Sequence, residues 1–236
     1  MGVMSRLNFE ESAEGPRYTP EPESGRRVRE PVFNNGAWPV LVLVGAIVGG
    51  YALQSRVDVN VIAAAFAFTP DALGTGRWWT LVSSLFVHGN WPHALMNAAF
   101  ILAFGTPVAR YFGLGAAGGL WFLAFYLACG VLATLPFAVI HSGEAVALMG
   151  ASGAASGLMG AAARLIAGQG TPGPILSRPV LAFGAAWVIV NLIMAVIGAA
   201  MIPGAGDGAI GWEAHLAGFA AGVLLIGLAG RLARRG

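Results

Sequence analysis

A serine and a histidine stand near the starts of two apolar stretches and could act together as nucleophile and base. Ser152 lies in the sequence GASG (150–153), and His215 lies in AHLAG (214–218). A serine hydroxyl is a weak nucleophile until a neighbouring base takes its proton, and a neutral imidazole can take that proton and later give it to a leaving amine. The pair therefore indicates nucleophilic hydrolysis, if the fold brings the two side chains together.

Two more polar residues, His93 and Asn97, begin another apolar stretch and could stabilise negative charge. They are four positions apart, so on a helix they share one face. Their side chains, with the free backbone N–H of Ser152 at a helix start, are suitable donors for the oxyanion of a tetrahedral intermediate. We expect His93, Asn97 and Ser152 to form the oxyanion hole.

The sequence predicts a Ser–His dyad rather than a triad. No Asp or Glu lies inside the apolar stretches near Ser152 or His215. Glu213 is two residues from His215, and we discount it as an exposed loop residue. Some other contact must orient the imidazole, and the sequence does not identify it.

The composition identifies the environment of these residues as a membrane. The chain has 236 residues, of which 57% are hydrophobic and 10% charged, and its mean hydropathy is +0.72. These values indicate a polytopic membrane protein. The net charge of +2 comes with no basic face or aromatic-basic module, so we expect no nucleic-acid partner. Cys129 is the single cysteine, which excludes an intrachain disulfide and a Cys-based metal site, and we expect no cofactor.

The apolar stretches predict an all-α fold, a bundle of six transmembrane helices. Each stretch is close to the ~20 residues that span a bilayer. Their ranges are 37–54, 92–111, 115–140, 149–168, 179–201 and 213–232.

Two polar or mixed segments complete the predicted organisation. Residues 1–33 are polar and predict a cytosolic, mostly disordered tail, which leaves 34–236 as the six-helix domain. The long first loop, residues 55–91, is rich in aromatic residues and is expected to lie at the membrane interface.

The arginines predict the orientation of the helices. With a cytoplasmic N-terminus, eleven arginines fall inside and only Arg56 and Arg77 fall outside. We therefore expect both termini to be cytoplasmic. We also expect a multi-pass protein of the cell membrane, the inner membrane of a bacterium. Ser152, His215 and His93 would then all lie near the outer face. Small residues flank the first two, so the helices that carry them could approach closely.

Three motifs in this order resemble those of the rhomboid intramembrane serine proteases. They are GASGAASGLMG around Ser152, HGNWPHALMN ending in Asn97, and AHLAGFAAG around His215, and the resemblance covers about residues 37–232. It implies that Ser152 is the nucleophile and His215 the general base. It also implies that His93 and Asn97 contribute to the oxyanion hole.

The resemblance carries further expectations and two differences. It implies that His88 is a structural residue of the first loop and that Gly150 and Gly153 support the nucleophile. Substrates would be single-span membrane proteins, cut near the outer face. The chain differs in having Trp79-Thr80 where many members carry Trp-Arg, and Ser156 where well-known members often carry a tyrosine.

Three other interpretations are weighed against hydrolysis. A transporter or channel could use the His and Asn residues to line a proton or solute path, although the two halves of the chain show no repeat. A non-catalytic relative that binds membrane helices would be expected to lack Ser152 or His215. A metal site from His88, His93 and His215 is conceivable, but no carboxylate completes it, and we predict none.

Overall fold

The computed structural model describes residues 37–197 and 211–235. The predicted tail, residues 1–33, lies outside the described residues, as do the last residues of the predicted span 179–201. In the described part of the chain the fold is helical, without named strands.

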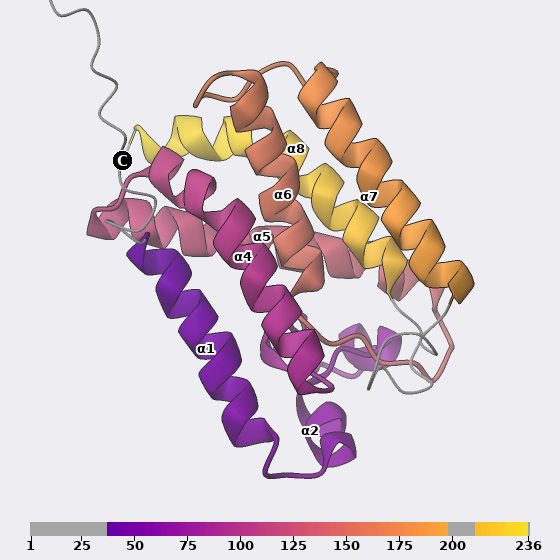
Figure 1. The fold of residues 1–236 in the computed structure, drawn as a ribbon. Helices are drawn as coiled ribbons and strands as arrows, with labels where there is room; N and C mark the ends of the chain where they lie inside the picture. Colours follow the sequence, from indigo (N-terminus) through magenta and orange to yellow (C-terminus); the bar gives the residue numbers. More distant parts are fainter. Residues whose placement is uncertain (1–36, 198–210, 236) are drawn as a thin grey trace, which may run out of the picture. The chain divides into compact units, whose positions relative to one another are not determined.

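Six helices of sixteen residues or more lie in the six predicted ranges (Figure 1). They are α1 (Trp38–Gln54), α4 (Trp91–Phe112), α5 (Ala116–Ile140), α6 (Ser152–Ala167), α7 (Arg178–Ile197) and α8 (Trp212–Ala233). Four of them, α4, α5, α7 and α8, are long and apolar enough to cross a membrane. The chain is thus a multi-pass membrane protein.

The other two helices, α1 and α6, are shorter, so the six-span count stays a prediction. They have 17 and 16 residues, and at ~1.5 Å per residue each is shorter than the ~30 Å hydrocarbon core. Helix α6 is buried along most of its length, from Gly153 to Leu165. It contacts α4, α5, α7 and α8, so other helices rather than lipid surround it (Figure 1).

The predicted first loop folds into short helical pieces. These are α2 (Val59–Phe66), η1 (Pro70–Leu73), α3 (Thr80–Ser83) and η2 (Ser84–Phe86). Arg77 helps to fix the segment, since its guanidinium donates to the carbonyl of Ala64 at 2.7 Å, near the end of α2. Phe68 forms an antiparallel bridge with Leu148, just before the start of α6. The segment's location at a membrane interface stays a prediction.

Glycines allow α6 and α8 to touch through their backbones. A Cβ atom on Gly218 would collide with the backbone carbonyl of Gly153, and one on Gly222 would collide with that of Gly157. Small residues at such positions let helices approach more closely than side chains would permit. Because Gly153 follows Ser152 and Gly218 lies one turn after His215, this contact sets the distance between the two predicted catalytic side chains.

Candidate active site

The structure brings Ser152 and His215 into hydrogen-bond contact. The Oγ atom of Ser152 lies 2.8 Å from Nε2 of His215. Ser152 is the first residue of α6, and His215 lies in the first turn of α8, where it is 8% exposed. A partly buried hydroxyl and a buried imidazole at this distance can exchange a proton.

The turn before Ser152 depends on Gly150. Its φ of 115° lies in a region that L side chains rarely adopt. A Cβ atom here would also lie only 2.6 Å from Nε2 of His93. The N–H of Gly150 donates to the carbonyl of Ser84 at 2.9 Å, which ties the turn to the first loop. Conformation and space therefore both require glycine at this position.

His88 holds the residue next to Ser152. It is buried, and its Nε2 accepts the N–H of Ala151 at 3.4 Å. Burial, aided by the nearby His93, lowers the pKa of His88 to about 3, so the ring is neutral at pH 7 and keeps a lone pair for this bond. The backbone N–H of His88 in turn donates to Oε1 of Gln54 at 3.2 Å. Gln54, at the end of α1, also donates to the carbonyl of Phe86 at 2.6 Å. Its role in holding the first loop was not predicted from the sequence.

The predicted oxyanion donors lie beside the same turn. Asn97 is buried and its Nδ2 donates to the carbonyl of His93 at 3.0 Å, which leaves its second amide hydrogen available. The side chain of Asn90 caps the start of α4 by accepting the N–H of His93 at 2.8 Å. A Cβ atom on Gly150 would contact both His93 and Asn97. The geometry is compatible with an oxyanion hole, and that role stays a prediction.

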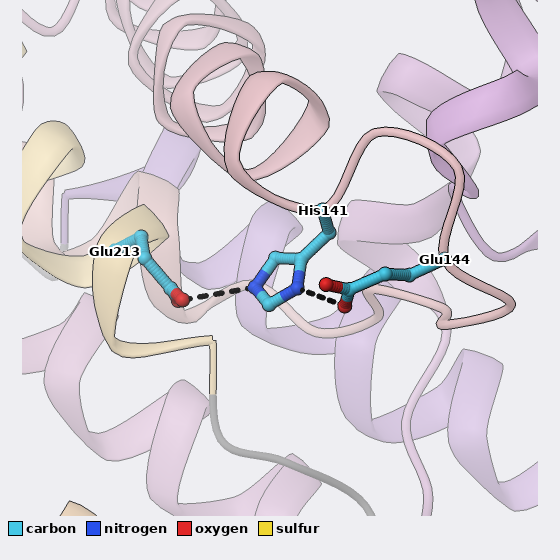
Figure 2. Close-up of polar contacts among 3 residues, drawn as sticks. All are labelled: His141, Glu144 and Glu213. Carbon is cyan, nitrogen blue, oxygen red and sulfur yellow. Dashed lines mark hydrogen bonds and ion pairs between the residues drawn. The ribbon is translucent and has the colours of Figure 1, made fainter.

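Glu213 lies elsewhere than the sequence suggested. It belongs to the first turn of α8 and is 7% exposed, so its description as an exposed loop residue was wrong. Figure 2 shows its carboxylate bound to His141, with Oε1 at 2.9 Å from Nε2, while Nδ1 of His141 lies 2.6 Å from Oε2 of Glu144. Both bonds raise the pKa of His141, and the bond to Glu144 has the larger effect. Glu213 therefore pairs with His141 and not with His215.

Asn191, on α7, is the site residue that sequence reasoning missed. Its Oδ1 lies 2.7 Å from Nδ1 of His215, and the contact is buried. The candidate site residues named from the sequence did not include Asn191, whereas the structure puts it against the imidazole. Ser156 takes no part in this contact, because its hydroxyl donates to the carbonyl of Ser152 at 2.7 Å.

Metal binding finds no support in the described ranges, 37–197 and 211–235. Nowhere in them do three His, Cys, Asp or Glu side chains group so that they could hold an ion. His88 accepts the backbone N–H of Ala151. The ring of His93 packs against that of His88. His215 contacts Ser152 and Asn191.

Comparisons with known proteins agree on one family. A family model described as "Rhomboid domain" matches residues 75–232, more than half of the chain. Rhomboid protease GluP of Bacillus subtilis is 27% identical over 144 residues, which are 59% of this chain and 27% of that protein. RHOMBOID-like protein 9, chloroplastic, of Arabidopsis thaliana is 31% identical over 91 residues, 39% of this chain and 19% of that protein. The matched segments are thus a minor part of each relative's length.

Proposed function

The chain belongs to the rhomboid family, and from this premise we propose that it is an intramembrane serine endopeptidase that cleaves transmembrane segments of other membrane proteins. The observation that carries the proposal is the 2.8 Å contact between Ser152 Oγ and His215 Nε2, at the starts of two helices in backbone contact. That contact supplies a nucleophile and its base inside a membrane protein.

In the first half of the reaction, Nε2 of His215 takes the hydroxyl proton as Oγ of Ser152 attacks the carbonyl carbon of the scissile bond. The oxyanion that forms is stabilised by the N–H of Ser152, which the positive end of α6 supports, and by side-chain donors of His93 and Asn97. His215 then gives its proton to the leaving nitrogen, the C–N bond breaks, and an acyl-enzyme remains on Ser152.

In the second half, water replaces the departed amine. His215 takes a proton from the water as its oxygen attacks the ester carbon, and the same donors stabilise the second oxyanion. Collapse of this intermediate returns the proton to Oγ of Ser152 and releases the new carboxyl terminus. Both halves use the same two side chains.

The substrates that suit this site are single-span helices cut near the outer face of the membrane. A helical peptide bond is shielded by its own hydrogen bonds, so the substrate must unwind locally before Ser152 can attack. The arginine distribution supports an orientation in which the starts of α6 and α8 face the outside and both termini are cytoplasmic.

Labelling by a fluorophosphonate, followed by cleavage of a single-span substrate in proteoliposomes, tests the proposal. Wild-type protein should be labelled and should cut the substrate, and Ser152→Ala and His215→Ala should each abolish both reactions. Labelling that persists in Ser152→Ala would refute the assignment of the nucleophile. A labelled protein that cuts no transmembrane substrate would refute the assignment of the substrate class.

A further inference from the structure

The general base is held by α7. His215 contacts Ser152 through Nε2 and Asn191 through Nδ1, so both nitrogens of its ring are engaged by neighbouring helices. Asn191 is 2% exposed, which leaves water little access to this bond. A buried imidazole with two fixed partners cannot rotate without losing one of them.

The direction of the bond follows from the second contact of Asn191. Its Nδ2 donates to the carbonyl of Trp187 at 2.8 Å, one turn earlier on α7. A carbonyl only accepts, so the amide nitrogen must face Trp187, and the amide oxygen must face His215. Nδ1 of His215 therefore donates to Oδ1 of Asn191.

This direction determines which nitrogen is the base. A neutral imidazole carries one hydrogen, and with that hydrogen on Nδ1 the lone pair is on Nε2. Nε2 is the atom that lies 2.8 Å from Ser152 Oγ. The other tautomer would direct N–H at the serine and a lone pair at the amide oxygen, and it could not accept the hydroxyl proton.

Helix α7 also limits the tilt of the ring. The ring of Trp187 lies near that of His215, with centroids 5.7 Å apart and planes at 40°. Trp187 is itself packed against Phe100 of α4, with centroids 5.5 Å apart. One helix thus provides both the acceptor for Nδ1 and an aromatic neighbour for the imidazole.

We infer that Asn191 is a positioning residue for the proposed hydrolysis: through its bond to Nδ1 it fixes the tautomer and orientation in which His215 activates Ser152. The inference rests on the proposed function. Asn191 contacts neither Ser152 nor the scissile bond in this mechanism, so its loss should lower the rate of the chemical steps and leave substrate binding unchanged.

Four variants separate positioning from a merely structural role. Asn191→Leu keeps the approximate size and removes the acceptor. Asn191→Asp keeps an oxygen facing Nδ1 and replaces the amide donor to Trp187 by a second, ionisable carboxylate oxygen. Val190→Ala, at a half-exposed neighbouring position, is the matched control on the same helix. Ser152→Ala reports on the proposed function itself.

The measurements are the fluorophosphonate labelling rate, kcat and KM for a single-span substrate, and the melting temperature. Asn191→Leu should lower the labelling rate and kcat by roughly 10- to 100-fold at unchanged KM, as expected for a displaced base. Asn191→Asp should recover most of the loss, and Val190→Ala should match wild type.

Two outcomes would overturn the inference and differ from a failure of the proposed function. If Asn191→Leu lowers the melting temperature but is labelled at the wild-type rate, Asn191 is structural only. If Asn191→Asp is as slow as Asn191→Leu, the acceptor oxygen does not control the base. Labelling of Ser152→Ala would instead show that the proposed nucleophile is wrong, whatever Asn191 does.

Discussion

Replacing Gly218 by alanine should slow catalysis by moving α8 away from α6. In the structure a Cβ atom at this position would lie 2.9 Å from the carbonyl carbon of Gly153 and closer still to its oxygen. These are backbone atoms, so no side chain can swing aside. To reach an ordinary contact of about 3.4 Å, the helices must separate by at least about 0.5 Å.

The separation acts directly on the proposed dyad. Adding about 0.5 Å to the 2.8 Å contact between Ser152 and His215 gives about 3.3 Å, past the usual limit for a hydrogen bond from a hydroxyl. A misplacement of ~1 Å can cost about 100-fold in rate, so a displacement of about 0.5 Å should cost about tenfold, or about 1.4 kcal/mol in activation free energy. The crowding itself should lower the free energy of unfolding by about 1–3 kcal/mol.

The assay is cleavage of a single-span substrate in proteoliposomes, with the melting temperature measured on the same preparations. Gly227→Ala is the matched control on α8, because its Cβ atom would meet only the side chains of Arg164, at 3.5 Å, and Pro172, at 4.0 Å. This control should cleave at the wild-type rate and gain up to ~1 kcal/mol in stability. A folded Gly218→Ala protein that cleaves within about twofold of wild type would refute the view that the α6–α8 contact sets the catalytic distance.

Three further predictions concern the surroundings of the site. Gly150→Ala should lower the labelling rate at least tenfold, because the residue would be strained by ~1–3 kcal/mol and would displace His93; an unchanged rate would contradict this. Folding lowers the pKa of His88 from 6.5 to about 3, so stability should be complete above pH 6.5 and fall by about 1.4 kcal/mol per pH unit below it. Below pH 6.5 the melting temperature of wild type should therefore fall more steeply with pH than that of His88→Gln. Equal slopes for the two proteins would exclude the effect. Folding raises the pKa of His141 above 6.5, so its bonds to Glu144 and Glu213 should stabilise the protein below pH 6.5 and weaken as pH rises through the folded value. The difference in melting temperature between wild type and His141→Gln should shrink over that range, and a constant difference would argue against the titration.

The helices were predictable because the signal for each is local. A run of about twenty apolar residues can be recognised without knowing which residues pack against it. Where both ends of a helix are described, its bounds agree with the predicted range to within three residues. The GASG and AHLAG sequences were equally legible, since small residues beside a serine and a histidine favour close helix contact.

The contacts that complete the site were not predictable in this way. Asn191 is a polar residue inside an apolar stretch, and its partner His215 is 24 positions away on another helix. Its spacing of four from Trp187 was a usable signal, since both residues then lie on one helix face. Gln54 and the pairing of His141 with Glu213 depend on contacts across 32 or more positions, which no local pattern encodes.

If His215 is the general base, its bond to Asn191 links the proposed catalysis to the lipid around α7. Of the four membrane-spanning candidates, α7 is the least enclosed by protein, with 11% buried against 33% to 44% for the others. Its outer surface carries large apolar side chains such as Leu181, Ile189 and Leu192, which are more than half exposed. The proposed general base is therefore bonded to a helix whose exposed apolar face would contact acyl chains in a bilayer. Bilayers of different thickness should shift the tilt of α7 and change kcat in a protein whose sequence is unchanged.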